Sequence, residues 1–185
     1  ELTVYDNTAL DADQFVRELP VPKVNGIGNR TDTVWQINPV TLEEEQVVIK
    51  NELSWDKIVK YRVKEDWFFD EETSTFQARI IGLAPVMEAF DASGNYIGDE
   101  TMYWIYYPDL RPILAKYEAY NPYNDAIQLS WEDIMEARLF DSYIYKESNV
   151  YDRQIQEYAT GLDALFESER IKQELFEFEH DLWSY

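Results

Sequence analysis

The first half of the chain alternates apolar and polar residues, a pattern typical of strands with one buried face. Residues 59–69 predict a strand with an apolar dry face and a wet face that carries the basic residues Lys60, Arg62 and Lys64. Residues 76–90 predict the next strand, in which Gly82 and Pro85 indicate a bulge or a sheet edge. Residues 102–107 are apolar on both faces and therefore predict a central strand.

In the second half, apolar residues recur every three or four positions, which predicts amphipathic helices. The first helix would have Asp109 as its N-cap and Pro112 in its first turn, where the missing N–H costs little. Ser130 and Asp133 have the spacing of a capping box, which predicts a second helix over residues 130–140.

Two further helices are predicted toward the C-terminus. One would begin near Asn149 and Asp152 and end at Gly161. The longest would cover residues 163–183, with His180 in its last turn near the negative end of the helix dipole. Its apolar seam would consist of Ala164, Ser168, Ile171, Leu175, Phe178 and Leu182, widened by Leu165, Phe176 and Trp183. This seam either covers the sheet or lies against another subunit.

The order of these elements predicts a single α+β domain, with an antiparallel sheet in the N-terminal half packed by helices of the C-terminal half. Residues 46–185 would form this domain. Residues 1–45 would form a loosely held N-terminal arm or loop with one short helix, opened by a weak capping pattern at Thr8 and Asp11 and ended by prolines.

Composition supports a folded domain. The chain has 185 residues, of which 45% are hydrophobic and 16% aromatic, and this content excludes intrinsic disorder. Tyrosine and tryptophan beyond the needs of a core often mark surfaces that meet partners. The longest apolar run, residues 80–87, is too short to span a bilayer, so we expect no direct membrane insertion.

The net charge of the chain limits the classes of molecule that it is expected to bind. Lys and Arg number 16 against 37 Asp and Glu, and the net charge of −21 disfavours binding to nucleic acid or to anionic membranes. A basic protein partner is the better hypothesis, and a plain solubilising surface is the alternative. Copies of such a chain repel one another, so we expect either a basic partner or a basic strip such as Lys60, Arg62 and Lys64 to offset that repulsion.

Few residues could support catalysis or bind a cofactor. The sequence has one histidine and no cysteine, which excludes an H-E-x-x-H zinc site and thiol catalysis. The glycines at 26 and 28 lack the rest of a phosphate-binding motif, and residues 89–100 fit a hairpin turn better than a calcium loop. We therefore expect no catalytic residue, metal or cofactor. The alternative is an acidic extracytoplasmic enzyme with a glycosidase-like carboxylate pair.

Several segments resemble one family. They are RIIGLAPV (79–86), WIYYPDLRPILA (104–115), NPYNDA (121–126), SWEDIMEARLF (130–140), YKESNVYDRQI (145–155) and GLDALFESERIKQELFEFEHDLW (161–183). Together they are similar to the GldN/PorN family, periplasmic components of the type IX secretion and gliding motility machinery of Bacteroidota. The resemblance covers roughly Trp55 to the C-terminus. Family members begin with a further segment rich in Trp, Arg and Asp, so we interpret this chain as a trimmed form or proteolytic core.

The resemblance implies a non-catalytic structural subunit. Such subunits form a ring on the periplasmic side of the outer membrane, self-associate and bind a lipoprotein of the PorK/GldK type, with other secretion-machinery subunits as further possible partners. Within residues 104–155 we predict nine contact residues, for which a purely structural role is the alternative. They are Tyr106, Tyr107, Arg111, Arg138, Tyr143, Lys146, Asn149, Tyr151 and Arg153.

Overall fold

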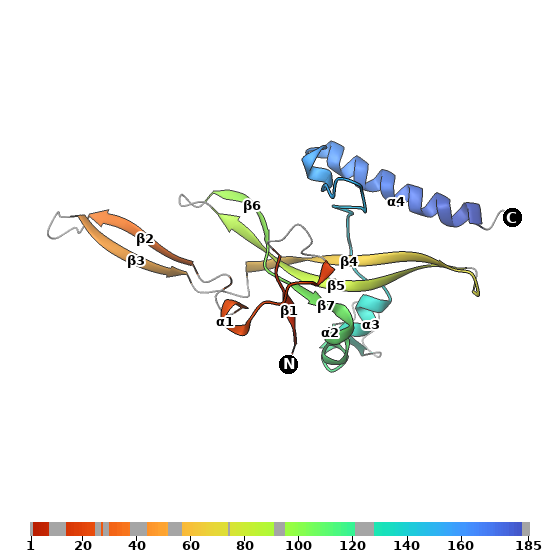
Figure 1. Ribbon diagram of the computed structural model, residues 1–185, viewed down its shortest axis with the longest axis horizontal. Helices are drawn as coiled ribbons and strands as arrows, with labels where there is room; N and C mark the ends of the chain where they lie inside the picture. Colours follow the sequence, from red (N-terminus) through yellow and green to blue (C-terminus); the bar gives the residue numbers. More distant parts are fainter. Residues whose placement is uncertain are drawn as a thin grey trace. The chain divides into compact units, whose positions relative to one another are not determined.

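The computed structural model confirms an α+β fold with an antiparallel sheet in the N-terminal half and helices in the C-terminal half (Figure 1). It describes residues 2–7, 14–24, 27, 30–37, 44–51, 57–73, 75–90, 95–120 and 128–182. The chain clusters into two compact units. Unit 1 comprises Glu1–Asp66 and Arg79–Tyr117, and unit 2 comprises Trp67–Ala78 and Glu118–Tyr185. The predicted division after residue 45 stays a prediction.

The main sheet has the strand order β1-β7-β5-β4, and β6 also pairs with β5. Its strands are β1 (Val4–Tyr5), β4 (Ile58–Asp70), β5 (Thr75–Phe90), β6 (Tyr96–Thr101) and β7 (Trp104–Tyr106). In Figure 1 the long strands β4 and β5 run side by side. The two long predicted strands are thus confirmed, and β7 is central, between β1 and β5.

Of the two alternatives predicted for Gly82 and Pro85, a bulge or a sheet edge, the edge is wrong, because β5 pairs with β4, β6 and β7. Gly82 pairs with Tyr106 of β7, whereas Val86 pairs with Thr101 of β6. Pro85 lies between these two pairings, where the neighbour of β5 changes. A residue without an N–H fits such a change of partner, and its carbonyl accepts a hydrogen bond from Met102 N–H at 3.0 Å.

The faces of β4 are the reverse of the prediction. Val59 and Tyr61 are 53% and 59% exposed, and the three basic residues between and after them are half-buried. Lys60 forms an ion pair with Asp99 of β6. Alternation alone shows that a strand has two faces, and the long aliphatic stems of lysine and arginine let a basic face be the inner one.

The apolar segment 102–107 is also divided differently from the prediction. Met102 and Tyr103 join β6 to β7, and Tyr107 begins helix α2 (Tyr107–Leu114). Asp109 therefore lies in the first turn of α2, and Tyr106 is the N-cap residue. Pro108 accounts for this earlier start, since proline favours the first positions of a helix.

The N-terminal segment is tied to the sheet, so the expected loosely held arm is wrong for the residues described there. Besides β1, it contributes Phe15, whose ring makes edge-on contacts with Tyr5, Trp104 and Tyr106 at centroid distances of 5.4, 6.3 and 5.5 Å. Phe15 has a φ of 58°, which turns its ring onto Gly82. A Cβ at position 82 would overlap the Phe15 ring, so only glycine leaves room for this contact.

Unit 1 also contains α1 (Val21–Val24) and a hairpin of β2 (Arg30–Ile37) and β3 (Glu44–Asn51). In the segment 14–19, where the sequence predicted the end of a short helix, Gln14 is in a 3-10 turn, and the remaining residues are irregular apart from the bridge between Glu18 and Tyr5. Four predicted features lie outside the described residues: the capping pattern at Thr8 and Asp11, the turn at 91–94, the segment 121–126 and Trp183.

In unit 2, β8 (Glu118–Ala119) pairs with β9 (Leu129–Ser130), and β9 leads directly into α3 (Trp131–Glu136). The predicted capping box is confirmed. Ser130 Oγ accepts from Asp133 N–H at 3.1 Å, and Asp133 Oδ2 accepts from Ser130 N–H at 2.8 Å. The helix ends at Glu136 rather than near residue 140, because Arg138 is in the left-handed region with a φ of 52°.

The third predicted helix is wrong. Around Asn149 the chain forms a loop, followed by the short 3-10 turn η3 (Ile155–Glu157). Gly161, with a φ of 61°, precedes the last helix α4 (Leu162–Leu182) instead of ending one. The long C-terminal helix is itself confirmed. Among the described residues, no helix is long and apolar enough to cross a membrane.

Candidate protein-contact surface

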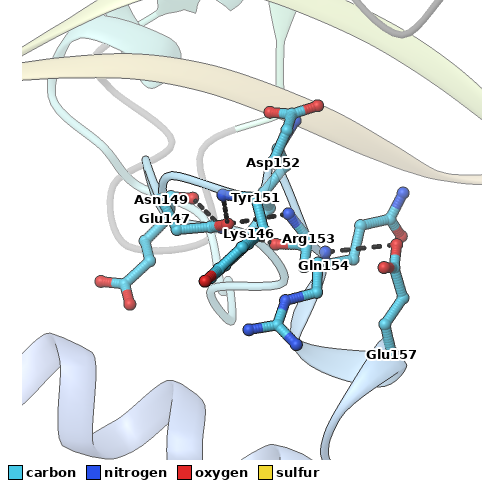
Figure 2. A network of polar contacts seen from close by, with 8 residues as sticks. All are labelled: Lys146, Glu147, Asn149, Tyr151, Asp152, Arg153, Gln154 and Glu157. Atoms are coloured by element: carbon cyan, nitrogen blue, oxygen red, sulfur yellow. Dashed lines mark hydrogen bonds and ion pairs between the residues drawn. The ribbon is translucent and has the colours of Figure 1, made fainter.

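The loop from Tyr145 to Ile155, here called the Asn149 loop, is held in shape by one side chain. The Asn149 amide donates to the carbonyls of Glu147 and Arg153 at 3.0 and 2.8 Å. Its Oδ1 accepts from the N–H groups of Tyr151 and Arg153 at 3.2 and 2.9 Å. Figure 2 shows this amide at the centre of the turn. An asparagine side chain carries both a donor and an acceptor. It can therefore bond backbone N–H and carbonyl groups that have no partner in a helix or strand.

Further contacts close the Asn149 loop. The Ile155 N–H donates to the Tyr145 carbonyl at 2.9 Å, which joins the two ends. Lys146 Nζ lies 2.7 Å from Asp152 Oδ1, and Asp152 has a φ of 52°. Aspartate tolerates this left-handed conformation better than most residues. The loop therefore has a defined conformation without being helical.

The Arg153 guanidinium stacks on two tyrosines. Its central carbon lies 4.8 Å from the Tyr151 ring centroid and 5.8 Å from that of Tyr158. The Tyr158 hydroxyl in turn donates to Glu167 of α4 at 3.4 Å. Asp152, the neighbour of Arg153 in the chain, pairs with Lys146. Arg153 therefore orders the two aromatic rings.

The same chain of contacts continues along α4. Arg170 forms ion pairs with Glu167 and Glu174, one turn on either side. The hydrogen bonds that Arg170 donates to Glu167 and Glu174 raise the pKa of Arg170, and those to Glu167 hold the pKa of that carboxyl below its usual range. Removal from water and the nearby Glu167 carboxylate raise the pKa of Tyr158. These charges stay ionised near neutral pH and fix one side of the helix.

One face of α4 packs on its own unit. Ser168 and Ile171 are only 6% and 4% exposed, and Ser168 Oγ accepts from Ile144 N–H at 2.8 Å. Ile155 of η3, which also contacts α4, is 2% exposed. Further along the helix, the Phe178 ring lies 5.7 Å from that of Phe76. The predicted seam therefore buries its central residues within unit 2.

A second apolar face of α4 is exposed, which the sequence did not predict as a separate surface. Leu165 and Phe176, which were predicted to widen the seam, are 54% and 63% exposed. Leu162 and Phe166 are 71% and 70% exposed. At 3.6 residues per turn these four side chains lie within an arc of about 100°, roughly opposite Ile171. They are called the outer stripe below. A helical wheel that marks only the stronger seam would overlook them.

The tip of the Asn149 loop is exposed as well. Val150 is 96% exposed and Tyr151 is 75% exposed. A valine held outside the protein by an ordered turn has no role in the core of this chain. Apolar side chains presented in this way are typical of surfaces that bind another protein.

The nine predicted contact residues lie in three settings, and their role stays a prediction. Tyr107 is buried at 1% exposure, Tyr106 contacts Phe15, and Arg111 is exposed on α2. Arg138 is half-buried, with its guanidinium carbon 5.1 Å from the Trp67 ring centroid and 5.6 Å from that of Phe140. The remaining five lie in unit 2 at or beside the Asn149 loop: Tyr143, Lys146, Asn149, Tyr151 and Arg153.

The carboxyl groups give little support to the glycosidase-like alternative. Such a pair needs one acid with a raised pKa. Hydrogen bonds or cations shift the pKa of four carboxyl groups down: Asp70, Asp99, Asp133 and Glu167. The described residues also contain no group of three His, Cys, Asp or Glu side chains that could hold a metal ion.

Comparison with known proteins identifies the family to which the chain belongs. A family model for the gliding motility associated protein GldN matches residues 1–184. The match includes residues 1–54, to which the resemblance in sequence did not extend. None of the curated proteins compared with the chain matches it. With nearly its whole length covered by one family model, the chain belongs to the GldN family of gliding motility associated proteins.

Proposed function

We propose that this protein is a non-catalytic structural subunit of the type IX secretion and gliding motility apparatus. It would belong to a periplasmic ring at the inner face of the outer membrane, together with copies of itself and a lipoprotein of the PorK/GldK type. The observation that carries the proposal is the GldN family match over residues 1–184. The family ties the chain to gliding motility; the ring, the partner and the location are part of the proposal.

The surface chemistry supports an assembly role. The Asn149 loop and the outer stripe both present large apolar side chains on an ordered framework, and the helix that carries the outer stripe is net acidic. An ordered contact surface loses little conformational entropy on binding, which favours stable assembly over a transient encounter. A catalytic role would need convergent polar groups with pKa values suited to proton transfer. The downward shifts of the perturbed carboxyl groups fit solvated ion pairs and caps better.

A gene deletion in a gliding bacterium that carries this protein tests the proposal. We expect the deletion to abolish both colony spreading and the release of secreted proteins into the medium, and a plasmid copy to restore both. The protein should also fractionate with the outer membrane only while the lipoprotein is present. Normal spreading and secretion in the deletion strain would contradict the proposed function.

A further inference from the structure

The outer stripe of α4 is an apolar face on a helix of net negative charge. Within the stripe lies Glu169, and Glu177 follows along one edge, while Lys172 is on the other edge. From Leu162 to Leu182 the helix carries seven acidic residues and two basic ones. Arg170, one of these two, is already held between Glu167 and Glu174. The face therefore combines exposed leucine and phenylalanine with a helix on which acidic residues outnumber basic ones.

The charge decides between two occupants of this face. Two copies that met through α4 would bring like charges together, which is unfavourable. A copy could instead offer a basic strip, as the sequence predicted for β4. That strip is already engaged within unit 1, because Lys60 pairs with Asp99 and Lys64 Nζ lies 5.8 Å from the Phe15 ring centroid. A second copy of the chain is thus a poor match for the outer stripe.

We propose that the outer stripe binds a different protein, through a surface on which apolar residues are bordered by lysine or arginine. An amphipathic helix of basic character has this chemistry, with its apolar side chains against Leu162, Phe166 and Phe176 and a cation near Glu169. The proposal rests on the proposed function, since it assigns to the lipoprotein partner a place on this chain. Contacts between copies would then use other surfaces.

The test measures affinity of the full chain for a soluble form of the PorK/GldK-type lipoprotein by isothermal titration calorimetry. We expect the double variant Phe166→Ser with Phe176→Ser to bind at least tenfold more weakly than the parent, because serine has a similar helix propensity but no apolar surface. The matched control is Ile97→Ser on β6, where an apolar side chain is also 64% exposed. It should bind within twofold of the parent.

The charge part of the proposal has its own variant. Glu169→Lys should weaken binding several-fold at low salt, and its affinity should depend less on salt than that of the parent. The control Glu72→Lys, in the exposed turn after β4, should leave both the affinity and the salt dependence unchanged. A Glu169→Lys variant that binds more tightly would mean that the partner surface is acidic, which would overturn the proposal.

The remaining outcomes are equally distinct. If the parent binds and the double variant binds as well, the outer stripe is not the contact, although the proposed function stands. If the double variant loses self-association in light scattering instead, the occupant is a second copy and the proposal is wrong. A marked fall in its thermal unfolding temperature would mean that the stripe packs within the chain, which also overturns it. A parent that ignores the lipoprotein contradicts the proposed function together with this inference.

Discussion

The surroundings of Phe15 and the Asn149 loop use aromatic residues in opposite ways. Around Phe15, rings from three separate segments of unit 1 pack edge to face above Gly82, and the sheet gains stability from them. In the Asn149 loop, hydrogen bonds and the Arg153 stack hold the backbone, while Tyr151 and Val150 remain exposed. The aromatic residues near Phe15 thus stabilise the fold, whereas those of the Asn149 loop stay exposed, as expected of residues that contact another protein.

This contrast predicts that substitutions in one region change mainly stability and substitutions in the other change mainly binding. Substitutions around Phe15 should lower the free energy of unfolding and affect binding only through folding. Substitutions at the exposed tip should change binding and leave stability nearly unchanged. The following predictions test this separation, beginning with the largest expected effect.

Gly82→Ala should lower the free energy of unfolding by about 1–3 kcal/mol, because the new methyl group would overlap the Phe15 ring and approach Trp104 Cε3 at 3.3 Å. Phe15→Ala should lower it by about 2–4 kcal/mol through lost packing. Urea unfolding measures both. The double variant is the control: once the ring is absent, Gly82→Ala should cost distinctly less. Strict additivity of the two effects would show that the side chain at position 82 and the Phe15 ring are not in contact.

Asn149→Ala should lower the free energy of unfolding by about 1 kcal/mol, because four hydrogen bonds to the loop backbone are lost at an exposed site. Its larger effect should be local, with faster amide hydrogen exchange at Tyr151 and Arg153. Asn149→Asp keeps the side-chain acceptor and loses the donor, so its amide exchange rates should fall between those of the parent and those of Asn149→Ala. Unchanged exchange in the alanine variant would refute the role assigned to this side chain.

Acid should weaken the contact between β4 and β6. Burial raises the pKa of Asp99, but hydrogen bonds from Lys60 and Tyr96 outweigh it, so the folded pKa lies below the ordinary value of 3.8. A carboxyl group with a lowered folded pKa stabilises the fold above its unfolded pKa, and this contribution is lost as the pH falls through the folded value.

The thermal unfolding temperature of the parent should therefore fall more steeply below about pH 4 than that of Asp99→Asn. Asp66→Asn, an exposed position on β4, serves as the control and should follow the parent. The difference in unfolding temperature between the parent and Asp99→Asn should be small, because the Lys60 side chain is 42% exposed. A steeper acid loss in Asp99→Asn than in the parent would mean that the sign is wrong.

The smallest stability effect is expected at the tip. Val150→Ser with Tyr151→Ser should change the free energy of unfolding by less than about 0.5 kcal/mol, since both side chains are largely exposed. Circular dichroism during urea unfolding measures it. A loss above 1 kcal/mol would show that these residues serve the fold, as the rings around Phe15 do.

Local signals in the sequence predicted several elements well. The alternation over 59–69, the Ser130 capping box and the long C-terminal helix are all found, because each depends on neighbours within one turn or one strand. The segment around Asn149 was misread as a helix start. Asparagine is favoured both at helix N-caps and in turns, and only the return of the chain to Tyr145 distinguishes the two.

Contacts distant in sequence were beyond prediction. The buried face of β4 depends on Asp99 and Phe15, some 39 positions ahead and roughly 50 positions behind. The outer stripe was hidden within a wider seam, since spacing alone does not say which of two apolar helix faces the chain itself covers. Two of the predicted contact residues, Tyr143 and Tyr151, are exposed, whereas the exposure of Val150 and of the outer stripe did not follow from the sequence.

Light scattering after size exclusion tests the central claim most directly, with the full chain alone and mixed with the soluble lipoprotein. The account predicts a single mixed peak whose mass exceeds that of either protein, and its disappearance with the Phe166→Ser and Phe176→Ser double variant. Two separate peaks at the masses of the individual proteins, under low and moderate salt alike, would contradict an assembly role for this surface.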